Sequence, residues 1–363
     1  MQIGIIGAGQ LGQMLGIAAR ELGHRCFFLD PSGKPPAARV GPVIQAPFDD
    51  RVALTVLADK CDVLTYEFEN VPVDALTDIA DLKPIYPPPE ALRHAQDRLA
   101  EKQLFESLDI PLPQYFAVDT PEDLHEAIGS IGLPLVLKTR RLGYDGKGQF
   151  VLRSAEQFDA AWQELGGREL IAEQWVPFDY EVSAIGVRNV AGETAMYCLT
   201  HNEHVDGILR TSRAPAGDAT LTKLANEYMQ RLLERLDYVG VLALELFVAN
   251  GALLANEFAP RVHNSGHWTI EGATTSQFAN HILAITGESP GPTDTRGYPG
   301  MINLIGQISA TVQQGHEGSL HDYGKAPRPG RKLGHVTVIA ESSEDRDHQI
   351  SKIADSVTKS TSG

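Results

Sequence analysis

The chain has 363 residues, of which 47 are acidic and 31 are basic, so its formal net charge is −16. This length predicts two or three domains, and the negative charge argues against a general nucleic-acid or anionic-membrane surface. The longest apolar run, residues 239–259, is interrupted by Glu245 and Asn250, so we expect no membrane span. Cys26, Cys61 and Cys198 are widely spaced and form no metal motif, and the apolar surroundings of Cys26 and Cys61 indicate buried thiols in a reducing cytosol.

The first 90 or so residues alternate short apolar runs with amphipathic stretches, which is typical of a parallel α/β domain. Strands are predicted at IGII, CFFLD, VIQA and VLTYEFE, and helices near 11–22, 51–60 and 72–81. The three prolines at 87–89 are expected to form a stiff connection after this domain.

A glycine turn follows the first predicted strand, at Gly7-Ala8-Gly9-Gln10-Leu11-Gly12. Its spacing is that of dinucleotide-binding folds, and the helix that follows offers its N-terminus to an anion. Asp30 ends the second strand, about where an NAD enzyme keeps its ribose-binding acid. These residues alone leave two alternatives open: an NAD(P)-dependent dehydrogenase, or a protein that binds another phosphate.

A second glycine loop is more informative. One helix is expected over 95–108, and 110–180 reads as a small β-rich segment with helices near 121–129 and 155–165. Within it, Lys138 ends an apolar strand and leads into a turn rich in cations and glycines, RRLGYDGKG. Such a turn suits a polyphosphate, because glycines expose backbone N–H groups and cations neutralise charge. A solvated basic hairpin tip is the alternative, although a lysine after an apolar strand is costly without an anion.

Two glutamates interrupt the apolar run at 239–260, which reads as a β-hairpin with its turn at Ala249-Asn250-Gly251. Counting outward from the turn places Glu245 and Glu257 nearly opposite each other on adjacent strands. Two close, desolvated carboxylates need a cation between them, and Mg²⁺ with nucleotide phosphates is the natural candidate. A register one residue off, with one glutamate in solvent, is the alternative.

Polar residues crowd the turn after this hairpin, RVHNSGHW. Arg261 beside a carboxylate pair can orient a small planar anion such as bicarbonate. A histidine pair at 201 and 204 has no further ligand spaced to join it, so a zinc site is not expected. Further along the chain, a helix is predicted at about 219–236 and a strand at GRKLGHVTVIA near the end.

Taken together, these segments resemble the ATP-grasp ligases, and within them the ATP- and bicarbonate-dependent family of purine biosynthesis that makes N5-carboxyaminoimidazole ribonucleotide. The motifs are GAGQLGQM, DRLAEKQLF, GYDGKGQ, THNEHVDGILRTS, NEFAPRVHNSGHW, MINLIG and RPGRKLGH. The resemblance implies a mixed α/β and α+β fold in three parts. These are a Rossmann-like pre-ATP-grasp domain at 1–95, an ATP-grasp domain at 96–310 with a β-rich lid at about 110–180, and a β-containing C-terminal segment at 311–363.

The resemblance also implies site residues, beginning with the cofactors ATP and Mg²⁺. ATP would be bound by Arg98, Lys138, Gly143, Tyr144, Asp145, Gly146, Lys147, Gly148, Gln149, Glu173, Gln174, Trp175, Val176, Glu181, His204, Asn256 and Glu257. Glu173 and Val176 would lie in the linker that reads adenine, and Glu181 would hold ribose. Glu245 and Glu257 would bind the metal, and Lys138 would offset charge on the transferring phosphoryl group.

The aminoimidazole ribonucleotide would meet both ends of the chain. Its predicted contacts are Gln10, Leu11, Glu67, Tyr144, Asp145, Lys147, Arg261, Lys325, Arg331 and Lys332. The backbone N–H groups of Gln10 and Leu11 would bind its phosphate, with the three tail cations on the same side. Arg261, His263 and Asn264 would handle bicarbonate, and Asp145 would accept a proton. Where the family commonly has two glycines before the tyrosine, this chain has Leu142-Gly143.

Two further alternatives remain at this stage: a sibling ATP-grasp transformylase that uses formate and glycinamide ribonucleotide, and a non-catalytic nucleotide sensor. The expected partners are small molecules and a second copy of the chain in a homodimer, with no nucleic acid and no membrane.

Overall fold

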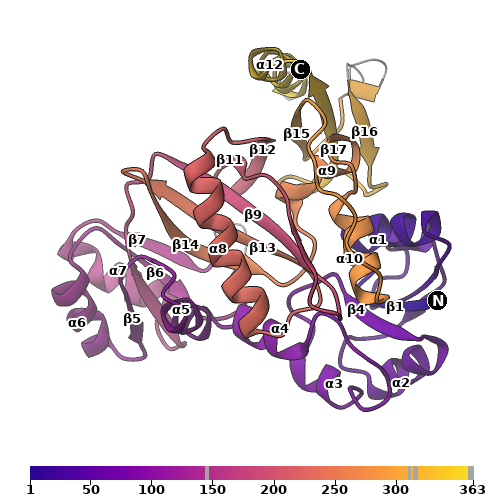
Figure 1. Ribbon diagram of the computed structural model, residues 1–363. Coiled ribbons are helices and arrows are strands. Elements are labelled where there is room, and N and C mark those ends of the chain that lie inside the picture. The colour runs from indigo at the N-terminus through magenta and orange to yellow at the C-terminus, as the bar shows by residue number, and fades with distance from the viewer. Residues whose placement is uncertain (144–146, 310–311, 314–317, 359–363) are drawn as a thin grey trace.

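Three β-sheets follow one another along the chain and organise the molecule (Figure 1). The structure is a computed structural model that describes residues 1–143, 147–309, 312–313 and 318–358. No helix within these ranges is long and apolar enough to cross a membrane.

The first sheet has four parallel strands, as the sequence predicts, and their order is β3-β2-β1-β4. Its part of the chain contains β1 (Gln2–Ile6), α1 (Gln10–Glu21), β2 (Arg25–Asp30), η1 (Pro36–Arg39), β3 (Val43–Gln45), α2 (Arg51–Lys60), β4 (Val63–Tyr66) and α3 (Val73–Thr77). Parallel strands end at the same edge of a sheet. This arrangement places Glu67, just after β4, beside the glycine turn that follows β1.

The connection to the second sheet differs from the prediction. Pro89 begins a helix, α4 (Pro89–Ala95), instead of extending a stiff connection, because proline is tolerated in a first helical turn that needs no N–H donor. The helix predicted over 95–108 is a separate one, α5 (Arg98–Ser107). Asp97 caps it, since its carboxylate accepts from the backbone N–H groups of Leu99 and Ala100.

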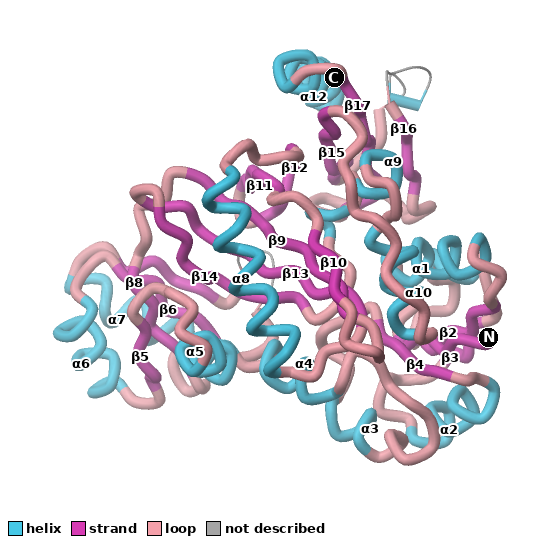
Figure 2. The backbone as a smooth tube through the Cα atoms, in the orientation of Figure 1, coloured by secondary structure: helices cyan, strands magenta, loops and turns pink. Residues whose placement is uncertain are grey.

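The second sheet is antiparallel, in the order β5-β8-β6-β7, with two helices on one face (Figure 2). Its elements are β5 (Tyr115–Val118), α6 (Pro121–Ile131), β6 (Leu135–Thr139), β7 (Gln149–Leu152), η2 (Ala155–Gln157), α7 (Phe158–Leu165) and β8 (Leu170–Gln174). The loop between β6 and β7 is the second glycine loop. It therefore lies at one end of a small, separately packed unit.

The third sheet is the largest, with the strand path β14-β13-β9-β11-β12-β15-β17-β16 and β10 paired to β9. Its strands are β9 (Tyr180–Arg188), β10 (Thr194–Met196), β11 (Thr200–Val205), β12 (Ile208–Arg213), β13 (Gly240–Ala249), β14 (Ala252–Ala259), β15 (Tyr298–Ile305), β16 (Ser319–Asp322) and β17 (Lys332–Ala340). Helix α8 (Ala219–Arg235) covers one face of the sheet, where it packs with Leu242 and Leu244 of β13. Helix α10 (Gln277–Ile285) covers the other face, where it packs with Val241 and Ala243 of β13. Strand β13 is therefore buried on both faces.

Sequence patterns did not predict α9 (Thr269–Gly272), α10 or α12 (Ser343–Thr358). Helix α12 is mostly polar, and its Ile350 and Ile353 pack against β15 and β17. Helix α10 is short, and it packs against both α1 and β13. Its Phe278 and Ile282 thus join the first domain and the large sheet in one apolar core.

Candidate active site

Two glutamates face each other across the β13–β14 hairpin. The turn residues Asn250 and Gly251 have φ angles of 50° and 75°, the positive values that a tight two-residue hairpin turn needs. The strands pair regularly outward from this turn until an extra residue, Asn256, forms a β-bulge that pairs Glu245 with Glu257. Paired residues project from the same face, so the bulge brings the two carboxylates together. The predicted opposition is confirmed, and the bulge is its cause.

Glu245 lies beside an imidazole. Its Oε1 is 2.9 Å from His263 Nε2, and its side chain is mostly buried. Burial acts to raise the pKa of this carboxyl, but the electrostatic attraction of His263 and its hydrogen bond to the carboxylate outweigh that effect. With smaller help from His204 and Lys332, the pKa of Glu245 falls below its ordinary value, so the side chain is an anion at neutral pH.

Glu257 is held by a guanidinium from the start of α5. Its Oε2 is 3.0 Å from Arg98 Nη1, and its side chain stays 40 % exposed. Among the described residues, neither Glu257 Oε1 nor Glu245 Oε2 has a hydrogen-bond partner. Each carboxylate therefore keeps one oxygen for a cation. Two carboxylates are also what Mg²⁺ uses when substrate phosphates complete its shell, and no larger acid or histidine cluster occurs in the described ranges.

A buried ion cluster lies next to this pair. Glu173 Oε2 is 2.9 Å from Lys138 Nζ and 3.4 Å from Lys102 Nζ. Burial alone would raise the pKa of Glu173, but the two lysines, with Arg98, lower it to about 2. The pKa of Lys138 is lowered, first by burial and then by repulsion from Arg98 and Lys102. An anion such as a phosphate would relieve that repulsion, which fits the role predicted for Lys138.

Sequence reasoning missed two residues of α5. Lys102 is fully buried and donates from Nζ to the carbonyl of Asn256 at 2.5 Å, and Glu101 Oε1 accepts from the backbone N–H of Phe258 at 2.7 Å. These two hydrogen bonds fix the backbone on either side of Glu257. The available signal was helical spacing, because both residues lie three or four positions before the buried Phe105 and so on its face of the helix.

The second glycine loop passes close to Thr139 at both of its ends. Gly143 and Gly148 approach its side chain so closely that an added Cβ would lie 3.4 and 2.8 Å from the hydroxyl oxygen. Leu142 has a φ of 62°, in the left-handed region that favours glycine, and it is 75 % exposed. The predicted site residues Tyr144, Asp145 and Gly146 lie outside the described residues.

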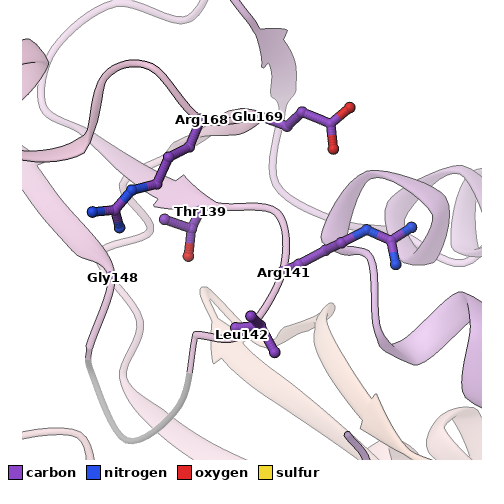
Figure 3. A pocket seen from close by; sticks show the side chains of 6 residues that line it. All are labelled: Thr139, Arg141, Leu142, Gly148, Arg168 and Glu169. Carbon is purple, nitrogen blue, oxygen red and sulfur yellow. The ribbon is translucent and has the colours of Figure 1, made fainter. Parts of the chain in front are cut away.

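A cavity of about 500 Å³ opens beside this loop (Figure 3). Arg168 extends toward Gly148, while Arg141 points away toward a helix. Arg141 pairs with Asp97 at 3.0 Å, and Arg140 pairs with Asp119 at 2.9 Å. The two arginines that follow Lys138 thus already have carboxylate partners.

The linker after β8 leads into the large sheet. The carboxylate of Glu173 faces the two lysines, Gln174 belongs to β8, and Trp175 is partly exposed with Arg153 5.2 Å from its ring centre. Beyond Val176, Glu181 Oε2 lies 2.6 Å from His204 Nδ1. That bond, with charge from Glu245, raises the pKa of His204 against the effect of burial. The structure thus brings the predicted ribose residue and the predicted histidine together.

The first glycine turn is occupied by the protein's own acids. Glu67 Oε1 accepts from Gly9 N at 2.6 Å, its Oε2 accepts from Gly12 N at 3.1 Å, and Asp30 accepts from Ala8 N at 2.9 Å. Burial raises the pKa of Glu67 to about 7, despite these bonds. Asp30, which ends β2, thus also holds the backbone of the turn. Three amides of the turn, those of Ala8, Gly9 and Gly12, are therefore bonded to carboxylates of the protein itself.

The tail of the chain meets this turn. Lys325 Nζ donates to Gln10 Oε1, and burial together with nearby cations lowers the pKa of Lys325 to about 8. The backbone N–H groups of Gln10 and Leu11 bond to no other described residue. Arg331 is partly buried, and its Nη1 donates to the carbonyl of Ala326 at 3.2 Å. Lys332 lies close enough to act on the charges of Glu245 and His204.

The predicted bicarbonate residues lie between these two centres. Arg261 Nη2 is 2.7 Å from Glu69 Oε1, which fixes the guanidinium from the first domain. Asn264 Nδ2 is buried and has no hydrogen-bond partner in the described structure. A buried amide without a partner is costly, so it indicates a place for an acceptor from outside the chain.

Family models match three successive parts of the chain. Residues 1–96 match the ribonucleotide synthetase preATP-grasp domain, 103–278 the ATP-grasp domain, and 300–349 the phosphoribosylaminoimidazole carboxylase C-terminal domain.

Several relatives cover nearly the whole length. An N5-carboxyaminoimidazole ribonucleotide synthase of Pseudomonas aeruginosa is 49 % identical over 340 residues, with 93 % of this chain and 94 % of the relative covered. The Bacillus subtilis synthase is 39 % identical over 351 residues, with 94 % and 92 % covered. These relatives remove the dehydrogenase alternative.

Solved structures agree with the sequence relatives. The Thermus thermophilus synthetase superposes with a TM-score of 0.94 at 48 % identity, with 98 % of both chains covered. The Aspergillus clavatus enzyme, in complex with ADP and 5-aminoimidazole ribonucleotide, has a TM-score of 0.91 at 30 % identity, with 99 % of this chain and 98 % of that one covered. The chain therefore belongs to the N5-carboxyaminoimidazole ribonucleotide synthase family, with a preATP-grasp domain followed by an ATP-grasp domain.

Proposed function

We propose that this chain uses ATP and bicarbonate to carboxylate the exocyclic amine of 5-aminoimidazole ribonucleotide. The products are N5-carboxyaminoimidazole ribonucleotide, ADP and phosphate, a step of purine (IMP) biosynthesis. One observation carries the proposal: Glu245 and Glu257 face each other with one free carboxylate oxygen each, beside the buried Lys138. That arrangement is what a metal-bound triphosphate requires.

The first step forms a mixed anhydride. An oxygen of bicarbonate attacks the γ-phosphorus of ATP, and the bond from phosphorus to the ADP oxygen breaks, which gives carboxyphosphate and ADP. Lys138 would offset charge on the transferring group. Arg261, fixed by Glu69, and the unpartnered Nδ2 of Asn264 would orient bicarbonate.

The second step forms the carbamate. The amine nitrogen bonds to the carboxyl carbon, the carbon–oxygen bond to phosphate breaks, and a proton leaves the nitrogen. The carbon arrives either as carboxyphosphate or as the CO₂ that it releases. Asp145, which lies outside the described residues, is the proton acceptor that the family resemblance implies. Carboxyphosphate is short-lived in water, so we assign residues 110–180 the role of a lid within the proposed 96–310 domain.

Glu245 and Glu257 would hold Mg²⁺, and Asn256 would add an oxygen. Bound there, the metal would neutralise phosphate charge. At the other end of the site, the amides of Gln10 and Leu11, with Lys325, Arg331 and Lys332, would receive the phosphate of the ribonucleotide. Lys325 has the most direct support, because it already contacts Gln10. A cytoplasmic homodimer is the assembly that we infer from the family and from the free cysteines.

The test is a phosphate-release assay in which ATP, bicarbonate and aminoimidazole ribonucleotide are omitted in turn. We expect full turnover only with all three present, and a carbamate product that accumulates with ADP. Turnover with formate and glycinamide ribonucleotide instead would identify the sibling transformylase. ATP binding without substrate-dependent hydrolysis would leave only a nucleotide sensor.

A further inference from the structure

A row of buried polar side chains runs from the proposed reaction site into the protein interior. It starts at His263, whose Nε2 lies 2.9 Å from Glu245. The other ring nitrogen, Nδ1, lies 2.8 Å from Ser265 Oγ, which lies 2.7 Å from Ser183 Oγ. Both serines are fully buried. Water therefore does not compete for these hydrogen bonds.

The row continues into the segment 200–212, whose motif has so far supplied only His204 to the proposed function. Asn202 Nδ2 donates to Ser183 Oγ at 2.9 Å, and Ser212 Oγ donates to Asn202 Oδ1 at 2.8 Å. Asn202 is 3 % exposed and Ser212 is fully buried. Neither residue is hydrogen-bonded to the carboxylate pair, and the hydrogen bonds of this row connect them to the site through His263.

The hydrogen bonds in this row point in one direction. His263 caps the turn η3 (Asn264–Gly266), and its Nδ1 accepts from the backbone N–H of Ser265 at 3.4 Å. A backbone N–H can only donate, so Nδ1 must carry a lone pair. From the other side, the amide of Asn202 donates to Ser183, whose own proton then goes to Ser265, and the Ser265 proton goes to Nδ1.

We propose that Ser212, Asn202, Ser183 and Ser265 are positioning residues that fix His263 as the tautomer protonated on Nε2, so that the ring meets Glu245 and the reaction site as a hydrogen-bond donor. The opposite tautomer would set a nitrogen lone pair 2.9 Å from an ionised carboxylate, which is repulsive. The same Nε2–H is suited to an anionic oxygen such as that of bicarbonate. That last role rests on the proposed function, whereas the tautomer does not.

The tautomer is measured directly by nuclear magnetic resonance of the full chain labelled with ¹⁵N-histidine. The His263 signals are assigned by their loss in His263→Gln. We expect a singly protonated ring with its proton on Nε2 in the wild type. A proton on Nδ1 alone, or protons on both nitrogens throughout, would overturn the proposal.

Asn202→Asp tests the direction of the row with almost no change of shape. A carboxylate accepts from Ser183, which can then no longer donate toward Ser265 and His263. We expect the fraction of His263 protonated on Nδ1 to rise severalfold, with kcat about tenfold lower and the KM for ATP unchanged. An unchanged tautomer, or a changed tautomer with an undiminished kcat, would overturn the proposal.

Thr200→Val is the matched control. Thr200 is a buried hydroxyl on the same strand, but it bonds to Trp268 and lies outside the row. We expect this variant to lose stability while it keeps the wild-type tautomer, and a tautomer change here would count against the row as the cause. The assays separate the two proposals: the expected tautomer without bicarbonate-dependent phosphate release refutes only the proposed function, and the reverse result refutes only this inference.

Discussion

The glycine turn of the first domain and the hairpin of the large sheet both bring acidic side chains together, but the hydrogen-bond partners of these acids differ. At the glycine turn, both oxygens of Glu67 accept from backbone N–H groups, and Asp30 accepts from a third. At the hairpin, each of Glu245 and Glu257 is bonded to one cationic or proton-bearing side chain and keeps an oxygen free.

The difference teaches how to separate a structural acid from a ligand-binding acid. A carboxylate whose two oxygens both accept from backbone N–H groups stabilises a turn and has no oxygen left to bind a metal. A carboxylate with one oxygen bonded is oriented, and its other oxygen stays open to a ligand. By this criterion, a mutation of a hairpin glutamate should mainly lower enzymatic activity. A mutation of an acid at the glycine turn should mainly change the stability of the fold.

The largest expected effect is on activity, in Glu257→Gln. Removing the charge of a metal carboxylate should lower kcat at least a thousandfold, or by about 4 kcal/mol in the barrier. The melting temperature should change little, because the side chain is 40 % exposed. Phosphate release and differential scanning fluorimetry are the measurements. Glu203→Gln, which removes a strand glutamate paired with Arg213 at 3.2 Å, is the control and should retain activity. Retained activity in Glu257→Gln would remove the metal assignment.

The next largest effect is expected in Lys102→Met, which removes the hydrogen bond from Lys102 to the carbonyl of the bulge residue Asn256. Lys102 is fully buried between Glu173 and the Asn256 carbonyl, so its loss should lower the free energy of unfolding by about 3 to 4 kcal/mol. It should also raise the Mg²⁺ concentration needed for turnover, because Glu257 is no longer held opposite Glu245. Urea unfolding and a magnesium titration measure the two effects. Lys60→Met, at an exposed lysine, is the control and should change neither quantity. Wild-type stability and magnesium requirement in Lys102→Met would show that the bulge does not depend on this hydrogen bond.

Glu67→Gln should act on stability in a pH-dependent way. The pKa of Glu67 is raised from 4.5 to about 7 in the folded chain, so its contribution to stability is complete below pH 4.5 and is lost as the pH rises through 7. The variant lacks this loss. Its free energy of unfolding, relative to wild type, should therefore rise by up to about 3 kcal/mol between pH 4.5 and pH 8.

Denaturant unfolding at a series of pH values measures this difference, with the exposed Glu21→Gln as a control that should show no such trend. A difference between Glu67→Gln and wild type that stays constant with pH would mean that Glu67 is not perturbed by its burial.

The smallest effect concerns the second glycine loop. Leu142 has the positive φ that favours glycine, and its exposed side chain packs little. Leu142→Gly should therefore raise the free energy of unfolding by about 0.5 kcal/mol, because relieved strain slightly exceeds the added chain entropy. Leu82→Gly, at an exposed leucine without positive φ, should lower stability instead. A loss of stability in both variants would contradict the strain at Leu142.

Sequence patterns predicted much of this fold. The parallel strands of the first sheet, helices α2 and α8, the turn at Asn250-Gly251 and the opposed glutamates follow from periodicity and turn chemistry, because those signals are local. Helices α9, α10 and α12 did not follow. Their patterns are short or mostly polar, and α10 and α12 gain their stability from packing on distant elements.

The sequence by itself determined which groups are available: a lysine strand, two glycine turns, an acidic hairpin and a basic tail. Only the tertiary structure decided which of them meet. It placed Glu67 on the amides of Gly9 and Gly12, Lys325 on Gln10, and Lys102 on the bulge carbonyl. The physical reason is that local propensity acts over a few residues, whereas a buried charge is stable only beside partners that folding brings from elsewhere in the chain.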